Sequence, residues 1–376
     1  MGKRYVVFGA IVLAAVVGLV GLARWTSNED DTQLDSTPAP MVREGLREVF
    51  VAPTGDDTQE GTIDHPLATI GRAANAVATR GTIYLRGGVY DQAVDNILPD
   101  HVTLQAYNGE AVILRPTAGN FVVLIAGDTK SHIVIEDLVL DGSNIGLDTV
   151  KVTAGAHDIT FVDCEIMNAK SPDANFNHGV LISSRAYNVT LTRCSVHDNG
   201  RDQFSHGIYC AGVAGIVIAE SHIYHNAGHG IHCAGNNDRA AYTIRRNFIY
   251  SNGDYGIGAY YGTATIVNNV VRRHQVANIR VGYALMGTAL WHNTLLQDNM
   301  TVNGVRVVTI TRANAVIDIA NNVIVDSTGP GIQLRGSNHA FGVLVQVRTN
   351  LMTNNRMGNL VADTGSNTLF IEVGTL

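Results

Sequence analysis

The sequence predicts an all-β solenoid, in which short strands coil into stacked turns. Two segments recur from about residue 133 onward: apolar-x-x-small polar-x-apolar, followed by Gly-Ile-x-small or a close variant. The shortest interval between polar positions of the first segment, from Asn247 to Asn269, is 22 residues, and the longest, from Cys164 to Cys194, is 30. Two anchors at matching intervals indicate turns of three short strands, with alternating apolar residues pointing inward and the next turn about 4.8 Å away.

The small polar residue of the first segment indicates a side-chain ladder at one tight turn. Asparagine amides stacked on successive turns can hydrogen-bond to one another and cap backbone groups, so we expect these residues to be structural. The positions are Cys164, Cys194, Ser221, Asn247, Asn269, Asn293, Asn322 and Asn350. No segment of helical period recurs, which excludes ankyrin and leucine-rich arrays, and a propeller blade needs roughly 40 residues.

Composition limits the class of protein. Hydrophobic residues make up 45% of the 376 residues, enough for a sizeable core, so a wholly disordered chain is excluded. Only 16% of residues are charged and 39 are glycine, which does not fit a helical bundle rich in Glu and Lys. The net charge of −7 leaves no excess of cations to neutralise phosphates, so no nucleic-acid partner is expected.

The amino terminus predicts export. Lys3 and Arg4 precede an uncharged apolar stretch over residues 5–23, about 28 Å long as a helix, which is close to the thickness of a bilayer core. We interpret residues 1–25 as a signal anchor, or as a signal peptide if the chain is cut after Ala23, and residues 26–47 as a flexible linker. The solenoid over 48–376 would then be extracytoplasmic, anchored in the membrane or secreted.

The segment that enters the solenoid carries a family resemblance. It contains Ala-Pro-Thr-Gly-Asp at 52–56, His-Pro-Leu-Ala-Thr-Ile at 65–70 and Gly-Thr-Ile-Tyr-Leu-Arg-Gly-Gly-Val-Tyr at 81–90. With the repeats, it resembles the right-handed parallel β-helix proteins of the pectate-lyase-like superfamily, which includes polysaccharide lyases and mannuronan C5-epimerases. The resemblance implies a single-stranded right-handed parallel β-helix, with its cap and first turns over 48–100. A short helix over 69–80 would close the open end of the tube.

The resemblance also implies where a substrate would lie. In this superfamily the carbohydrate usually lies along the outer face of the sheet that follows the longest turns, which here is the sheet of the second anchor. The residue after each anchor points outward and forms what we call the outward row: Lys151, Leu181, Tyr209, His232, Gly258, Arg280, Arg306 and Gln333. This row holds cations, a phenol and an imidazole but no carboxylate, which suits an acidic, uronate-containing polysaccharide.

The expected chemistry is removal of the C5 proton of a uronate, followed by cleavage or by epimerisation. Such a step needs a cation at the carboxylate, a base near C5 and a proton donor. Lys151 or Arg201 would neutralise the carboxylate, His206 or His232 would be the base, and Tyr209 the acid or the base. Further substrate-binding candidates on the row and on the long turns are Lys170, Asp173, His178, Asp202, His229, Tyr255, Arg280 and Arg306.

Two departures keep a second function open. The Asp-Pro-His-Glu motif of mannuronan epimerases and the Arg-x-Pro-x-x-Arg signature of pectate lyases are absent from the sequence. The alternative is a non-catalytic cell-surface module that binds glycans or has a structural or adhesive role. In both cases we expect a monomer.

The sequence assigns no metal or other cofactor, and calcium stays open as an alternative without an acidic cluster to support it. The outward row has no acidic cluster of the kind that binds calcium. His206, His229 and His232 raise the question of zinc, but they alternate between bend and strand positions and lack an obvious carboxylate partner.

The four cysteines fall into two vertical pairs, Cys164 with Cys194 and Cys210 with Cys233. The spacing between turns permits a disulfide in each pair, and an exported location permits oxidation. We favour the alternative, buried thiols packed as small apolar residues.

Overall fold

The computed structural model describes residues 46–376 except 173–175, 236, 238, 297–302, 311–314, 336–342, 364–368 and 375–376. The predicted membrane segment, 1–25, and nearly all of the predicted linker lie outside the described residues. Within the described part of the chain, no helix is long and apolar enough to cross a membrane.

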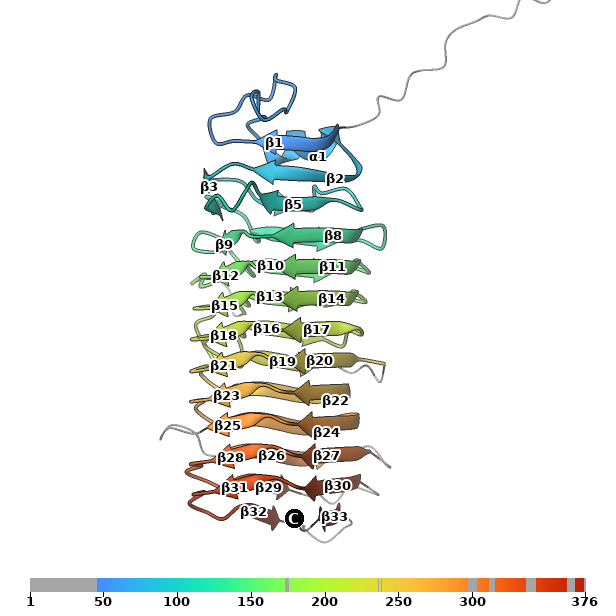
Figure 1. Ribbon diagram of the computed structural model, residues 1–376, viewed down its shortest axis with the longest axis vertical. Helices are drawn as coiled ribbons and strands as arrows, with labels where there is room; N and C mark the ends of the chain where they lie inside the picture. The colour runs from blue at the N-terminus through green and yellow to red at the C-terminus, as the bar shows by residue number, and fades with distance from the viewer. Residues whose placement is uncertain are drawn as a thin grey trace, which may run out of the picture. The chain divides into compact units, whose positions relative to one another are not determined.

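The described residues form a coil of parallel strands with three strands in most turns (Figure 1), which confirms the predicted solenoid. The first row of strands is β4 (Val94–Asp95), β7 (Val123–Ala126), β10 (Val150–Thr153), β13 (Val180–Ile182), β16 (Ile208–Ala211), β19 (Ile231–Ala234), β22 (Tyr255–Val267), β24 (Ala277–Trp291), β26 (Asn303–Ile310), β29 (Ile332–Arg335) and β32 (Leu360–Asp363). The second row is β1 (Leu46–Val51), β2 (Val77–Leu85), β5 (Thr103–Ala106), β8 (Ser131–Glu136), β11 (His157–Val162), β14 (Tyr187–Thr192), β17 (Ile216–Ala219), β20 (Ala241–Arg245), β27 (Val316–Ala320), β30 (Val343–Arg348) and β33 (Leu369–Gly374). The long strands β22 and β24 run through both rows.

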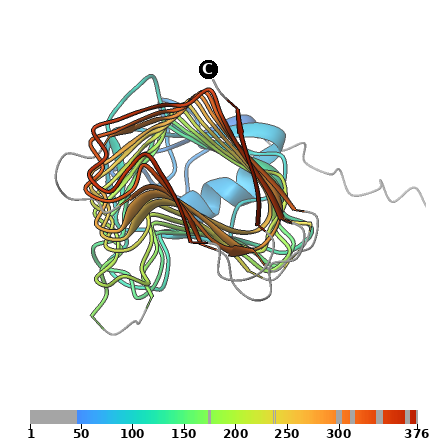
Figure 2. The ribbon, with the colours of Figure 1, turned by 90° about the horizontal axis from the view of Figure 1, so that it is seen from below.

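The third row of strands forms a separate sheet. It consists of β3 (Gly88–Tyr90), β6 (Val112–Leu114), β9 (Val139–Asp141), β12 (Glu165–Met167), β15 (Ser195–His197), β18 (His222–Tyr224), β21 (Phe248–Tyr250), β23 (Val270–Arg272), β25 (Thr294–Leu296), β28 (Val323–Val325) and β31 (Leu351–Thr353). Seen along the coil, the turns superimpose as one outline (Figure 2).

The second anchor and the outward row lie in register, as the spacing predicts. Ile208 pairs with Ile231 and Ile231 with Ile257, and all three side chains are fully buried in the core. One position along, Tyr209 pairs with His232, on the outer side of the same sheet. The outward row is therefore a true column, whose paired members are Lys151, Leu181, Tyr209, His232, Gly258, Arg280, Arg306 and Gln333.

The asparagine ladder is confirmed as a structural element. Each Asn Oδ1 accepts the backbone N–H and the Nδ2–H of the preceding member, as between Asn247 and Asn269 at 3.0 Å. The ladder continues through Asn293 and Asn322 to Asn350. A second ladder, which the repeats did not predict, lies at the bend that follows the third row of strands. It runs through Asn199, Asn226, Asn252 and His274.

The predicted helix is present but shorter than expected. α1 spans Ile70–Ala76, with Thr69 capping its first turn, and buries Ile70, Ala73 and Ala74. It lies across the bore in the view along the coil (Figure 2). The expectation that it reaches residue 80 is wrong, because Val77 is already extended and β2 begins there, paired with β1.

All four cysteines are free and buried, as favoured from the sequence. Cys210 pairs in register with Cys233 on the next strand.

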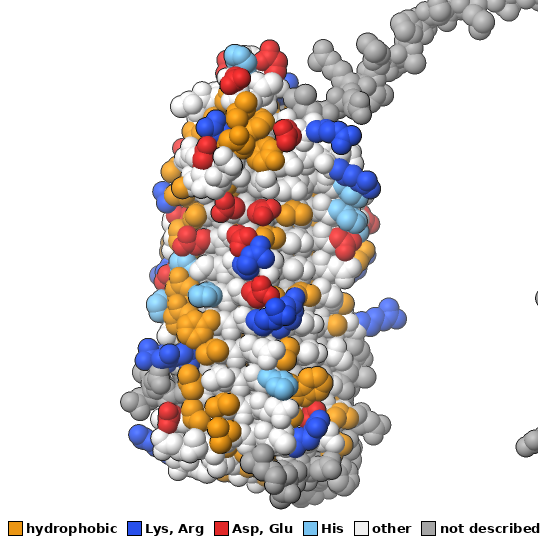
Figure 3. All heavy atoms as spheres, viewed as in Figure 1, with side chains coloured by type: hydrophobic (Ala, Val, Ile, Leu, Met, Phe, Trp, Pro, Cys, Tyr) orange, Lys and Arg blue, Asp and Glu red, His pale blue; other side chains and the backbone are white. Residues whose placement is uncertain are grey.

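On the face shown in Figure 3, acidic and basic side chains are interspersed over the turns.

Candidate functional site

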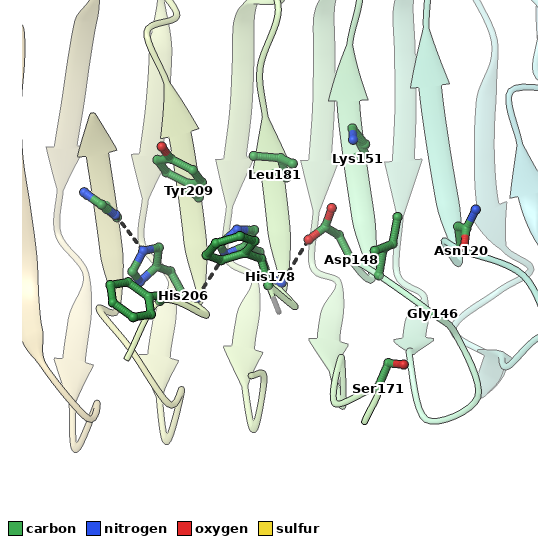
Figure 4. Close-up of a pocket in the computed structure, with 13 residues that line it drawn as sticks. Asn120, Gly146, Asp148, Lys151, Ser171, His178, Leu181, His206 and Tyr209 are labelled. Carbon is green, nitrogen blue, oxygen red and sulfur yellow. Dashed lines mark hydrogen bonds between the residues drawn. The ribbon is translucent and has the colours of Figure 1, made fainter. Parts of the chain in front are cut away.

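A polar ladder runs along the edge of the first row of strands, one turn to the next. Asp148 Oδ1 accepts the backbone N–H of His178 at 2.9 Å. His178 Nδ1 accepts that of His206, and His206 Nδ1 accepts that of His229, both at 3.0 Å. Figure 4 shows Asp148, His178 and His206 following one another beside the outward row.

The glycine after each ladder histidine allows close packing. At Gly207, a Cβ would lie 2.6 Å from Asn226 Nδ2 and 2.7 Å from Gly230 O. Glycine is therefore required at this position for the close approach of neighbouring turns. This packing brings the ladder beside the outward row.

The ladder and the outward row line an open cavity of about 850 Å³ (Figure 4). Four turns contribute the groups that bear on its chemistry, which are Asp148, Lys151, His178, His206, Tyr209 and His232. The structure thus brings together Lys151, His206, Tyr209 and His232, four of the five predicted catalytic residues. Two exposed aromatic rings, Phe176 and Phe204, also line it, in an edge-to-face pair with centroids 6.3 Å apart.

Aromatic packing orders the middle of the cavity. The Tyr209 ring stacks on that of His232, with centroids 4.9 Å apart. His206 contacts both rings edge-on. These side chains are held by one another as well as by their strands, so the wall of the cavity is preorganised.

The hydrogen bonds fix the tautomers of the ladder histidines. Because His206 Nδ1 accepts a backbone N–H, the neutral ring carries its proton on Nε2. That nitrogen lies 2.6 Å from His232 Nδ1, so His206 donates to His232, and His232 in turn carries its proton on Nε2. Neither ring has a nitrogen lone pair free to act as the predicted base.

Burial dominates the electrostatics of the cavity. It raises the pKa of Asp148 to about 6, against the nearby charge of Lys151 and the His178 N–H. It lowers the pKa of His178 to about 4 and that of His232 to about 2, and lowers the pKa of His206 further still. Burial also raises the pKa of Tyr209, which keeps this phenol protonated at neutral pH.

A second, smaller cavity of about 350 Å³ adjoins the first and shares Phe204, His206 and His232 with it. Its other polar groups are Gln203, from the loop before His206, and His229, Asp254, Tyr260, Tyr261 and Arg280. Two of the predicted substrate-binding residues, His229 and Arg280, therefore lie in this cavity.

Five predicted residues lie outside both cavities. Arg201 and Lys170 are exposed, and Lys170 Nζ lies 3.9 Å from Asp198. Asp202 accepts hydrogen bonds from Phe204 N and Ser205 Oγ within its own loop. Tyr255 and Arg306 hydrogen-bond to each other, with Arg280 on the same phenol oxygen.

Asp173 lies outside the described residues. Of the predicted neutralising residues, Lys151 faces the main cavity whereas Arg201 does not.

Sequence reasoning missed the carboxylates of both cavities. Asp148 belongs to the same column as His178 and His206, but it is followed by Thr149 where the histidines are followed by glycine, so the Gly motif did not reveal it. Asp254 lies one residue before Tyr255, and Tyr260 lies on the long strand β22, which has no counterpart among the described strands of earlier turns. Only the interval of 30 residues from Asp148 to His178 carried a usable signal.

The structure also tests the histidine cluster as a metal site. Although His206, His229 and His232 alternate between bend and strand positions, they do converge, because one ligand atom of each lies within 4.8 Å of the others. However, a metal ligand needs a lone pair, and His206 uses that of Nδ1 for a backbone N–H and carries a proton on Nε2. The geometry therefore does not fit a metal that requires all three rings.

Comparison with known proteins gives a family match over most of the coil. A family model described as the right handed beta helix region matches residues 123–300 and 206–372. Pectate lyase PEL9 of Emericella nidulans is 30% identical over 142 residues, which are 37% of this chain and 33% of that protein. The chain thus matches about a third of the length of this relative.

Solved structures show the same fold at low identity. The A-module of the mannuronan C-5 epimerase AlgE4 of Azotobacter vinelandii matches with a TM-score of 0.55 and 17% identity, over 79% of this chain and 91% of that one. The catalytic unit of a GH87 α-1,3-glucanase of Streptomyces thermodiastaticus matches with a TM-score of 0.57 and 13% identity, over 86% of this chain and 66% of that one.

Proposed function

Because the chain belongs to the right-handed β-helix family of the pectate-lyase-like superfamily, we propose that it acts on an acidic, uronate-containing polysaccharide as a lyase or a C5-epimerase. The observation that carries this proposal is the in-register outward row, with cations toward both ends and a phenol and an imidazole between them. The similarity to a pectate lyase supports the same substrate class.

The spacing of the cations suits an extended polyanion. Lys151 and Arg280 are separated by five steps of strand pairing, which is roughly 24 Å at about 4.8 Å per step. One sugar cannot reach both side chains. We therefore propose that the polymer lies along the coil axis, with one carboxylate at Lys151 and another at Arg280.

The groove supplies donors in place of a metal. Lys151 provides positive charge, and the Nε2–H of His232 and the Tyr209 phenol provide protons for hydrogen bonds. These groups can hold the carboxylate of a uronate and make its C5 proton more acidic. Export and membrane anchoring by residues 1–25 remain part of the proposal.

The test is an assay of the full-length chain on alginate, pectate and glycosaminoglycans. Cleavage by elimination appears as the ultraviolet absorbance of unsaturated products. Epimerisation appears as exchange of the C5 proton with solvent in NMR spectra recorded in D₂O. Binding of a polymer without either signal would overturn the enzymatic proposal and leave the non-catalytic glycan-binding module, and absence of binding would remove both.

A further inference from the structure

Two residues of the second cavity form a hydrogen-bonded pair that the predicted mechanism does not use. His229 Nε2 and the Tyr260 hydroxyl oxygen lie 2.9 Å apart, and both side chains are about 95% buried. Asp254 Oδ2 lies 3.2 Å from the other ring nitrogen, His229 Nδ1. A carboxylate, an imidazole and a phenol are thus in contact, in the spatial order Asp254, His229 and Tyr260.

The direction of proton movement follows from the partners. The carboxylate of Asp254 favours the tautomer with the His229 proton on Nδ1, which leaves the Nε2 lone pair to accept from the Tyr260 hydroxyl. His229 Nδ1 is buried and has no partner of hydrogen-bond geometry among the described residues, and Asp254 is the carboxylate beside it. Charging this imidazole would therefore strengthen its interaction with Asp254.

The outward row leaves room for this pair at one position. Gly258 stands between His232 and Arg280 in the row. A Cβ at residue 258 would lie 2.7 Å from His229 Cδ2 and 2.8 Å from the Tyr260 hydroxyl. The backbone of Gly258 does not have a positive φ, so the need for glycine here comes from the His229–Tyr260 pair.

A cation and a donor complete the surroundings of Tyr260. The Arg280 guanidinium lies 5.2 Å from the centroid of the Tyr260 ring, and both residues line the second cavity. The His232 ring contacts the Tyr260 ring edge-on, with centroids 5.1 Å apart. By contrast, among the described residues no imidazole backed by a carboxylate contacts the Tyr209 phenol of the main cavity.

From this arrangement we infer that the second cavity is the reaction centre, with Tyr260 as the base that removes the C5 proton. The inference rests on the proposed function. The Tyr260 oxygen takes the C5 proton while its own proton passes to His229 Nε2. The electron pair of the C5–H bond moves into the adjacent carboxylate group, which Arg280 holds, and Asp254 stabilises the imidazolium.

This inference gives different roles to the two cavities. Tyr260 is the catalytic residue, whereas His229 and Asp254 act through it as positioning residues. Lys151, three pairing steps or roughly 14 Å from His232, binds a neighbouring sugar of the same polymer.

The test compares four variants of the full-length chain on the polymer that the wild type turns over. Tyr260→Phe keeps the ring under Arg280 and removes the hydroxyl, and we expect kcat to fall at least about 100-fold. Gly258→Ala keeps every reacting group and displaces the pair, and we expect a fall of similar size. Gly71→Ala is the matched control, because a Cβ at residue 71 of α1 meets nothing within 4 Å.

Asp254→Asn separates positioning from folding. We expect a lower kcat with little change in KM, because the imidazolium formed in the reaction loses its counter-charge, whereas a purely structural role would alter both. Circular dichroism spectra and urea unfolding establish that each variant is folded. Wild-type turnover that survives in Tyr260→Phe within threefold would overturn the inference and leave the proposed function intact. A wild type inert on every polymer would overturn both.

Discussion

The backbone N–H of His229 donates to the Nδ1 of His206, one turn earlier in the coil, over 3.0 Å. This bond consumes the lone pair of one ring nitrogen and so places the proton on the other. It explains why three histidines whose ring nitrogens lie within 4.8 Å of one another do not provide three metal ligands.

We therefore predict that activity and stability do not depend on a metal. Treatment with EDTA should leave turnover and the Tm unchanged, and added Zn²⁺ should not raise the Tm. A site filled at 100 times its Kd would stabilise the fold by about 2.7 kcal/mol, which thermal unfolding detects easily. A saturating rise in Tm with Zn²⁺ that is lost in His229→Ala would contradict this prediction.

The buried imidazoles predict loss of stability in acid. Burial lowers the pKa of His178 from 6.5 to about 4, so between these values the unfolded chain binds more protons than the folded one. The contribution of neutral His178 to the free energy of unfolding is complete above pH 6.5. It is lost as the pH falls toward 4, by up to about 3 kcal/mol.

Urea unfolding at several pH values measures this effect. His178→Asn keeps an acceptor for the His206 N–H, and we expect a smaller loss of stability between pH 6.5 and 4 than in the wild type. His222→Asn, at an exposed position, is the matched control and should follow the wild type. If the free energy of unfolding of His178→Asn changed with pH as steeply as that of the wild type, His178 would be charged in the folded protein.

Asp148 predicts the opposite trend. Burial raises its pKa from 3.8 to about 6, so the folded chain binds more protons than the unfolded one between these values. Its contribution is complete below about pH 4 and is lost as the pH rises through 6. We expect Asp148→Asn to gain up to about 3 kcal/mol relative to the wild type between pH 4 and 7, measured as the difference in the free energy of unfolding. A difference in the free energy of unfolding between Asp148→Asn and the wild type that stays constant from pH 4 to 7 would contradict this prediction.

The periodic features of the fold could be predicted because each is repeated. The asparagine ladder and the column of Tyr209 and His232 follow from intervals, since a residue at the same place in the next turn is a spatial neighbour. Register alone also brought Lys151 into the same column. The exact end of the helix at Ala76 could not be predicted, because pairing of β2 with β1 overrides the helical propensity of the residues that follow.

Residues whose positions are not set by the repeat account for the errors in the predicted site. Tyr260 reaches the second cavity because β22 is a continuous strand with a space at Gly258, and neither feature has a period. Arg201 was placed in the groove on the basis of its long turn, yet the path of that turn carries it away. Convergence of side chains from different positions in the turn depends on packing, which the intervals do not encode.

The charge of Lys151 should control polymer affinity. The side chain lies in the main cavity, 5.2 Å from the centroid of the Phe121 ring, and Lys151→Gln removes its charge while keeping much of its length. Since hydrogen bonds to charged groups contribute about 1.5–3 kcal/mol, we expect KM to rise by at least about tenfold, with a weaker dependence on salt. Arg246→Gln, an exposed residue paired with Glu220, is the control for a change in net charge. Equal effects of the two substitutions would contradict a specific role of Lys151.

The exposed ring of Phe204 should bind the polymer without taking part in the chemistry. Its side chain is 56% exposed, lines both cavities and makes an edge-to-face pair with Phe176. An exposed aromatic pair at the junction of two cavities is typical of a ligand contact, since it gives the fold little burial in return. We expect Phe204→Ala to raise KM several-fold with kcat unchanged, and to alter the free energy of unfolding by less than about 0.5 kcal/mol. Phe204→Tyr keeps the ring and should restore the affinity; a loss of kcat in Phe204→Ala would instead place this ring at the reacting sugar.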